Sequence, residues 1–189
     1  DKNDKGTILS ILDEKIITAI LNENGDINLI NSQSNIIITL PKDGSILISS
    51  NEVKNPTIKI EKDRYRDYIR LINKNNVIIV INHVKTENYL YGVVPKEMSP
   101  SFHVEALKAQ AVAARSFAYS NISKHSADGF DLCDTIDCQV YSGYEVEKPS
   151  TNLAVDETKD ILAFYDGQII DALYHSTSSG FTEDSRNVW

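Results

Sequence analysis

The sequence predicts an α+β protein, in which a β-rich first half is followed by an α/β part built round one long alanine-rich helix. Short runs of β-branched residues, separated by turn residues, occupy the chain from residue 7 to about residue 82. After residue 83 the apolar residues recur at helical spacing. We therefore expect a β-rich region over 1–82 and a second region over 83–189, in a chain long enough to bury a core.

The first half contains six expected strands, each four or five residues long. They are Ile17–Leu21, Ile36–Leu40, Ser45–Ile48, Thr57–Ile60, Tyr68–Ile72 and Val77–Ile81. Turn residues such as Asn24-Gly25 and Asn55-Pro56 separate these runs. Many short strands at close spacing predict a twisted antiparallel sheet or a small barrel.

The second half has its strongest helical signal from His103 to Ile122, a stretch rich in alanine with no interior Gly or Pro. A buried stripe is expected at helical spacing, formed by Leu107, Ala111, Ala114 and Ala118. The small side chains of this stripe would let another element approach the helix closely.

Shorter elements surround this helix. Thr86 is expected to cap a short helix ending at Leu90, and Pro95 and Pro100 bracket an expected loop. Ser150 is expected to cap another helix that ends near Lys159. The remaining elements are an expected hairpin over 161–174 around Asp166-Gly167, and a polar loop over 175–180.

Composition excludes some classes of function. Nineteen basic and 27 acidic residues give a formal net charge of −8, which is unsuited to gripping a polyphosphate backbone, so nucleic acid is not an expected partner. No apolar run approaches the roughly 18 residues that cross a bilayer. The chain also opens on Asp1-Lys2-Asn3, which is not a signal peptide, so any export signal or anchor is expected to be absent from this stretch.

Four ordered motifs in the second half resemble those of the stage II sporulation protein D and amidase-enhancer family. They are Tyr89–Met98, Glu105–Tyr119, Cys133–Tyr141 and Tyr174–Gly180. The closing Thr182-Glu183 and Val188-Trp189 also fit, so that the resemblance covers about residues 63–189.

The sequence departs from the family pattern in two places. Ser179 precedes Gly180 where family members usually carry two glycines. The family domain also tends to continue past the Val-Trp pair, so we expect the catalytic domain over 83–189 to be truncated at its C-terminus.

The resemblance implies a lytic transglycosylase of peptidoglycan that cleaves peptide-stripped glycan strands between N-acetylmuramic acid and N-acetylglucosamine, leaving 1,6-anhydro ends. Glu97 matches the position of the family's catalytic glutamate. One carboxylate is enough for this reaction, because the nucleophile is the C6 hydroxyl of the sugar itself. Such an acid should be protonated at rest, and Val93, Val94, Met98 and Phe102 could supply the apolar surroundings. The alternative for Glu97 is a solvated carboxylate beside Lys96.

Other matched positions imply substrate contacts. Lys108 and Arg115 are seven residues apart and so share a helical face, where they could bind substrate or instead pair with acids and order the site. His175, Ser176 and Thr177 suit hydrogen bonds to sugar hydroxyls. A serine hydrolase is disfavoured, because the chain has no Gly-x-Ser-x-Gly elbow.

Cys133 and Cys138, separated by four residues, allow zinc, a disulfide or two free thiols. Thiolate and imidazole are good zinc ligands, and His125 is the expected third ligand, with His103 and His175 as alternatives. Some members of the family hold zinc through this segment, which favours a zinc site over a disulfide.

The resemblance leaves a second class of function open. Some members of the family are known chiefly as enhancers of a cell-wall amidase, so the chain could be a non-catalytic glycan-binding enhancer, or a scaffold that uses exposed strand edges. For a sporulation member the family implies a membrane-anchored, extracytoplasmic protein acting in engulfment, between the mother-cell and forespore membranes. A peptidoglycan amidase-endopeptidase and a membrane anchor protein are then the expected partners, beside the glycan strands themselves.

Overall fold

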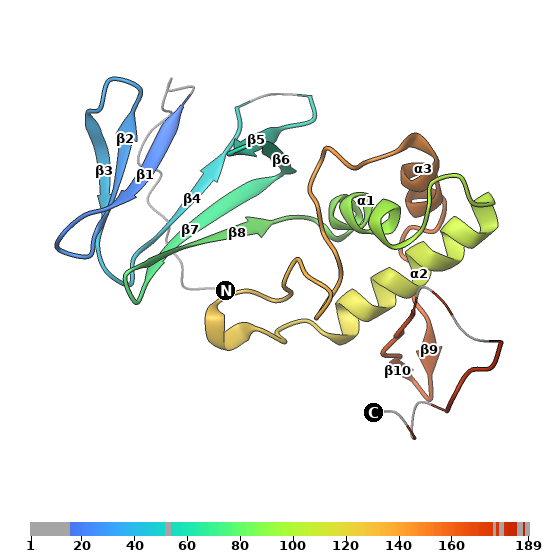
Figure 1. The fold of residues 1–189 in the computed structure, drawn as a ribbon. Coiled ribbons are helices and arrows are strands. Elements are labelled where there is room, and N and C mark those ends of the chain that lie inside the picture. The colour runs from blue at the N-terminus through green and yellow to red at the C-terminus, as the bar shows by residue number, and fades with distance from the viewer. Residues whose placement is uncertain (1–15, 52–53, 176, 178–179, 185–186, 188–189) are drawn as a thin grey trace. The chain divides into compact units, whose positions relative to one another are not determined.

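The computed structural model describes residues 16–51, 54–175, 177, 180–184 and 187 (Figure 1). This part of the chain is mixed α and β, as predicted, with strands in the first half and three α-helices in the second. Over the described residues the strands form four small sheets and no closed barrel, so the sheet alternative is confirmed. Within the same residues no helix combines the length and apolarity needed to cross a membrane.

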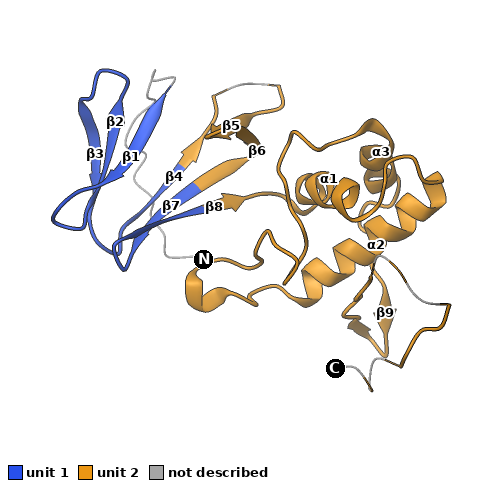
Figure 2. Cartoon of the chain, viewed as in Figure 1, with its two compact units in different colours: residues 1–47, 70–80 blue, residues 48–69, 81–189 orange. Residues whose placement is uncertain are grey.

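Two compact units divide the chain (Figure 2). One comprises residues 1–47 and 70–80, and the other residues 48–69 and 81–189. The second unit therefore takes in a piece of the β-rich half together with all three helices.

The first unit contains an antiparallel sheet of β1 (Ile17–Leu21), β2 (Ile27–Asn31) and β3 (Ile36–Leu40). The strand β2 was not among the expected strands, because a run of turn residues precedes it. Its Ile27 and Leu29 are nevertheless almost fully buried, since alternate residues of a strand face the same side.

A second sheet has the order β4-β7-β8, and the division between the units passes through all three strands. These strands are β4 (Ser45–Ser49), β7 (Tyr68–Lys74) and β8 (Val77–His83). Asn75 and Asn76 join β7 to β8 with φ angles of 54° and 57°, a left-handed pair typical of the tightest hairpin turn.

The second unit includes the hairpin of β5 (Thr57–Ile60) and β6 (Asp63–Arg66), which pair in antiparallel register. Two arginines of β6 attach this hairpin to the segment that precedes the third α-helix. Arg64 and Arg66 each place Nε 2.6 Å from a carboxylate oxygen, of Glu145 and Glu147 respectively. Both contacts are bidentate, a geometry that fixes orientation as well as distance.

Three helices form the core of the second unit: α1 (Thr86–Glu97), α2 (Val104–Ser120) and α3 (Pro149–Glu157). The predicted stripe on α2 is confirmed, because Leu107, Ala111, Ala114 and Ala118 are all at most 6% exposed. Two of these alanines, Ala111 and Ala114, pack in one cluster with Leu90, Val93 and Val94 of α1 and Val155 of α3, each fully buried. Each large aliphatic side chain buried here contributes roughly 1.5–3 kcal/mol.

The first helix differs from its prediction. It does not end near Leu90, but continues through Pro95 and ends at Glu97. Pro95 cannot donate to the Tyr91 carbonyl, and its ring crowds that carbonyl, so the perturbation falls in the last turn and the helix ends two residues later. The expected loop is thus shorter, and Glu97 is a helix terminus rather than a loop residue.

Helix capping also differs from prediction. Lys85 and Lys148 occupy the N-cap positions expected for Thr86 and Ser150, and neither makes a side-chain cap hydrogen bond. The cap of α2 is His103, whose Nδ1 accepts a hydrogen bond from the Glu105 N–H at 3.3 Å.

Two small elements complete the second unit. A 3₁₀ turn, η1, spans Ser126–Asp128. The predicted hairpin is confirmed with shorter strands, β9 (Phe164–Tyr165) and β10 (Gln168–Ile169). Asp166 and Gly167 turn between them with φ angles of 49° and 74°.

Replacing Gly92 by alanine should destabilise the chain by about 1–3 kcal/mol, although alanine is the better helix former by roughly 1 kcal/mol. A Cβ at this buried position of α1 would lie 2.5 Å from Cε2 of Tyr141 and 3.0 Å from the Gly143 carbonyl oxygen. Urea unfolding measures the change. In a Tyr141→Ala background the penalty should shrink, since the clashing ring is gone. An unchanged or higher stability of Gly92→Ala would contradict this packing.

Candidate functional site

Glu97, the last residue of α1, is half-buried and held by the chain that passes beside it. Its Oε1 accepts a hydrogen bond from the Val140 N–H at 2.9 Å. Two of the four expected apolar neighbours, Val93 and Val94, are fully buried in the preceding turn, whereas Phe102 is 55% exposed. The Glu97 carboxylate thus lies at the edge of the helical core, where the Val140 N–H holds one of its oxygens.

Tyr174 lies beside Glu97, close enough for the carboxylate to raise the pKa of the phenol. The orientation of the Tyr174 hydroxyl follows from Gln139. The Gln139 Nε2 donates both to the Tyr174 hydroxyl at 2.9 Å and to the Ala114 carbonyl at 3.2 Å. Because the tyrosine oxygen accepts from the amide, its own proton is directed toward Glu97.

The network continues away from Glu97 to Tyr89 of α1, whose hydroxyl donates to the Gln139 Oε1 at 3.1 Å. Gln139 is only 1% exposed, so its amide is committed to these partners. Burial raises the pKa of Tyr174 to about 12, where the Gln139 donor opposes the rise and the Glu97 charge adds to it. Burial also raises the pKa of Tyr89 far above its usual range. Both phenols therefore stay protonated near neutral pH and act as hydrogen-bond donors.

Arg115, expected either to bind substrate or to order the site, is 1% exposed. Its Nε and Nη2 bind the two carboxylate oxygens of Glu87 at 2.9 and 2.7 Å. Its Nη1 and Nη2 also donate to the carbonyls of Ile161 and Val155, each at 3.2 Å. One guanidinium thus joins α2 to α1, to α3 and to the chain after α3, which favours the ordering role.

Lys108 precedes Arg115 by two turns of α2, and its side chain lies between two acidic side chains. Its Nζ is 2.9 Å from Glu105 Oε1 and 2.7 Å from Glu157 Oε2. Hydrogen bonds to Glu157 and Glu105 raise its pKa. This amine stays partly exposed and could still exchange one acid for a substrate group, so its proposed binding role stays a prediction.

Of the three C-terminal candidates, His175 and Thr177 are exposed, and Ser176 lies outside the described residues. The His175 Nδ1 is 2.8 Å from the Thr177 carbonyl oxygen. His175 directly follows Tyr174, which places this loop next to a residue that contacts Glu97. Substrate contacts by these residues stay predictions.

The three expected metal ligands come together. The side chains of His125, Cys133 and Cys138 gather with Asp137, and their ligand atoms all lie within 4.8 Å of one another. Both cysteines are free thiols. The expected alternatives, His103 and His175, are not in this group.

The two distances from His125 match the spacing around a tetrahedral ion, and Cys133 lies slightly farther from Asp137. Bonds of about 2.0–2.3 Å to zinc put neighbouring ligand atoms roughly 3.3–3.8 Å apart. The His125 Nε2 is 3.4 Å from both Cys138 Sγ and Asp137 Oδ2, and Cys133 Sγ is 4.0 Å from the same Asp137 oxygen. Two sulfurs, one imidazole and one carboxylate form a donor set that zinc accepts.

The two thiols differ in acidity. Burial opposes ionisation of Cys133, but hydrogen bonds from Thr135 outweigh it and lower the pKa of that thiol. Burial raises the pKa of Cys138. Cys133 is thus the thiol that ionises first.

One short segment connects this cluster to Glu97. Cys138 belongs to the cluster, the next residue, Gln139, holds Tyr174, and the next, Val140, binds Glu97. A change in the position of Cys138 would therefore also shift Val140, whose N–H binds the Glu97 carboxylate.

Sequence reasoning missed four participants: Asp137, Gln139, Val140 and Tyr174. Asp137 was detectable, since it adjoins a predicted ligand and carries a carboxylate. Gln139 and Tyr174 lie inside matched motifs, but their role depends on distant chain segments meeting. Val140 acts through its backbone and has no side-chain signal.

Comparison with known proteins agrees with the motifs. Residues 74–165 match the family described as Stage II sporulation protein. This part of the chain is therefore similar to that family, which confirms the resemblance.

Three relatives illustrate the similarity. A protein named Amidase enhancer from Bacillus subtilis is 43% identical over 100 residues, covering 53% of this chain and 13% of the relative. Stage II sporulation protein D of the same organism is 35% identical over 124 residues, covering 58% and 36%. An uncharacterized protein of Brachyspira hyodysenteriae is 40% identical over 126 residues, covering 66% and 34%. The chain thus spans about a third or less of the length of each relative.

Replacing Arg115 by methionine should lower the free energy of unfolding by about 3–5 kcal/mol, because it leaves Glu87 partly buried without its cation. Urea unfolding is the measurement. The matched control is Lys108→Met on the same helix, whose amine is more exposed and should matter much less. A double Arg115→Met, Glu87→Met variant should recover part of the loss. An equal loss of stability in Arg115→Met and Lys108→Met would contradict the stabilising role of the buried ion pair between Arg115 and Glu87.

Proposed function

We propose that this chain cleaves peptidoglycan glycan strands as a lytic transglycosylase, with Glu97 as the acid and then the base. The observation that carries the proposal is that Glu97, at the position matching the family's catalytic glutamate, is half-buried, accepts a hydrogen bond from the Val140 N–H and lies beside Tyr174. Support also comes from the family match over residues 74–165. Peptide-stripped strands, cut between N-acetylmuramic acid and N-acetylglucosamine, are the proposed substrate.

The proposed reaction uses one carboxyl group twice. Protonated Glu97 gives its proton to the glycosidic oxygen as the bond from C1 to that oxygen breaks. The C6 hydroxyl oxygen of the same muramic acid then bonds to C1, and the Glu97 carboxylate takes the hydroxyl proton. The acid is regenerated, no water is consumed, and the product ends in a 1,6-anhydro ring. In this scheme the Val140 N–H and the Tyr174 hydroxyl hold the carboxylate in place through both steps.

A second function is supported by one relative, which is named Amidase enhancer. On that alternative the chain binds glycan and assists an amidase without cutting strands itself. An amidase-endopeptidase and a membrane anchor protein are proposed partners in either case, in an extracytoplasmic, membrane-anchored protein acting during engulfment in spore formation.

Replacing Glu97 by glutamine should abolish cleavage, because an amide can neither give nor take the proton. Wild-type protein and the variant are incubated with purified, peptide-stripped glycan strands, and the products are read by mass spectrometry. We expect anhydromuramyl ends from the wild type and none from Glu97→Gln. The matched control is Glu61→Gln at an exposed position between β5 and β6, which should cleave normally.

Three other outcomes decide between the alternatives. Reducing ends in place of anhydro ends would refute the lytic reaction in favour of hydrolysis. Equal cleavage by wild type and Glu97→Gln would refute the role of Glu97. Glycan binding without cleavage by a chain extended at its C-terminus would favour the enhancer function.

We further propose that His125, Cys133, Asp137 and Cys138 bind zinc. The fit of their spacing to a tetrahedral ion supports this. Bound zinc would supply a fixed cross-link between the two ends of the 125–138 loop. The chain's own residues do the rest, since Gln139 and Val140 transmit the position of Cys138 to Tyr174 and Glu97.

Zinc binding should be seen as one ion per chain in calorimetry and as a rise in melting temperature. Replacing a residue that only supports a metal ligand lowers metal affinity roughly 10–100-fold, so Cys133→Ser, which removes a ligand, should lower the zinc affinity by more. Asp137→Asn should also lower the zinc affinity. Affinity should fall as pH is lowered, because protons compete for imidazole and thiolate. Asp128→Asn, in the same loop but outside the cluster, is the control. A purified chain with no titratable thiol and no zinc would instead establish a disulfide.

A further inference from the structure

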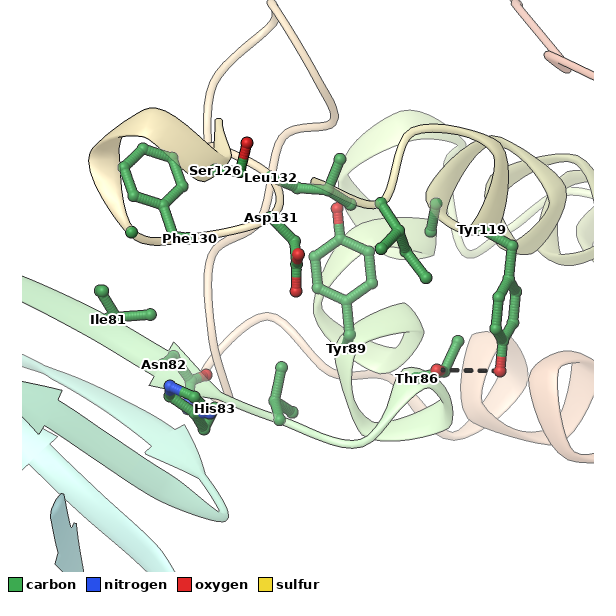
Figure 3. A pocket seen from close by; sticks show the side chains of 14 residues that line it. Ile81, Asn82, His83, Thr86, Tyr89, Tyr119, Ser126, Phe130, Asp131 and Leu132 are labelled. Atoms are coloured by element: carbon green, nitrogen blue, oxygen red, sulfur yellow. Dashed lines mark hydrogen bonds between the residues drawn. The ribbon is translucent and has the colours of Figure 1, made fainter. Parts of the chain in front are cut away.

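A cavity of about 450 Å³ lies at the N-terminal end of α1, the end opposite to Glu97 (Figure 3). The end of β8, the first turns of α1, the last turns of α2 and the loop after α2 surround it. Its lining residues are Ile81, Asn82, His83, Val84, Thr86, Tyr89, Ala118, Tyr119, Ile122, Ser126, Gly129, Phe130, Asp131 and Leu132. All of them belong to the second unit.

The walls of this pocket combine aromatic rings with a few polar groups. Tyr89, Tyr119 and Phe130 contribute the rings, and Figure 3 shows the Tyr89 ring between Asp131 and Tyr119. Tyr119 is 41% exposed, with its hydroxyl 3.3 Å from the Thr86 hydroxyl. Apolar walls with few convergent polar groups are typical of small-ligand sites. A pyranose ring matches such walls, since one of its faces carries C–H groups and its edge carries hydroxyls.

The charges of the pocket narrow the ligand class. Among the described residues that line it there is one carboxylate, Asp131, one imidazole, His83, and no lysine or arginine. Phosphate and carboxylate ligands are usually held by such cations. The lining therefore favours an uncharged sugar over muramic acid, which carries a lactyl carboxylate. The Asp131 side chain also accepts the Ser123 N–H at 3.1 Å, which keeps it oriented at the wall.

A chain of hydrogen bonds connects this pocket to Tyr174, the neighbour of Glu97. Tyr89, in the pocket wall, binds Gln139, which binds Tyr174, which contacts Glu97. Along α1, Tyr89 lies eight residues before Glu97, a rise on the order of 12 Å. A glycan strand bound at Glu97 could therefore reach the pocket within a few sugar units.

We propose that this pocket is a binding subsite for an N-acetylglucosamine-type ring, an uncharged N-acetylated hexose, in the strand that is cut at Glu97. The inference rests on the proposed glycan-cleaving function, whose substrate it specifies. The subsite holds the strand at a distance from the reacting bond, with the Tyr119 ring against one sugar face. The His83 and Asp131 side chains are the polar groups available to its hydroxyls and acetamido group.

The test separates binding from cleavage by using Glu97→Gln protein as the parent. Calorimetry measures its affinity for β-1,4-linked N-acetylglucosamine oligomers of two to six units. We expect adding Tyr119→Ala to weaken the longest oligomers by roughly fivefold, the scale of one lost aromatic contact. The matched control is Tyr165→Ala, at an 80% exposed tyrosine of β9 outside the pocket, which should bind as the parent does. A second pocket variant, His83→Ala, guards against a folding defect in Tyr119→Ala.

The outcomes separate this proposal from the proposed function. Unchanged affinity in both pocket variants, or no binding by the parent, would overturn the subsite even if wild-type protein still cleaves strands. Equally tight binding of anionic oligogalacturonides would overturn its preference for an uncharged sugar. Weakened binding in the pocket variants, with wild-type protein failing to cut strands, would support the subsite and refute the lytic reaction.

Discussion

The second unit depends on the ion pair and hydrogen bonds that the buried guanidinium of Arg115 makes. This guanidinium is almost fully enclosed, and it binds the Glu87 carboxylate and two main-chain carbonyls on different elements. A buried cation is tolerated only when its hydrogen-bonding capacity is used, so these three elements are held in one arrangement. Because Glu87 lies in the first turn of α1 and Glu97 ends it, orienting the helix at one end also orients the carboxylate at the other.

The segment Cys138–Val140 gives the site its second constraint. Its three successive residues contact three different groups: the proposed metal cluster, Tyr174 and Glu97. Main-chain geometry links these contacts tightly, since neighbouring residues cannot move independently by much. In this arrangement the zinc ion proposed above would act on Glu97 only through Gln139 and Val140. The arrangement also explains why the site needs a buried amide, because Gln139 can donate to Tyr174 and accept from Tyr89 at once.

Much of the second half was predictable because local signals there agree. The α2 stripe and the Asp166-Gly167 hairpin follow from periodicity and turn chemistry, and the structure has both. The errors share a cause. Pro95 and the two cap residues, Thr86 and Ser150, were interpreted by local preference, but packing of Val93 and Val94 against α2 carries α1 on to Glu97. The strand β2 was not predicted, because the turn residues next to it obscure the alternation of its apolar and polar residues.

The sequence by itself determined the resemblance to a family, the position of Glu97 and three of the four clustered metal-ligand candidates, since motifs keep residue identity and order. Only the tertiary structure decided that Arg115 is buried, that Asp137 joins the cluster, and that Tyr89, Gln139 and Tyr174 form one network. The reason is physical. Residues 50 and 35 positions apart meet in that network, and a contact over such a separation depends on how helices and loops pack rather than on any local preference.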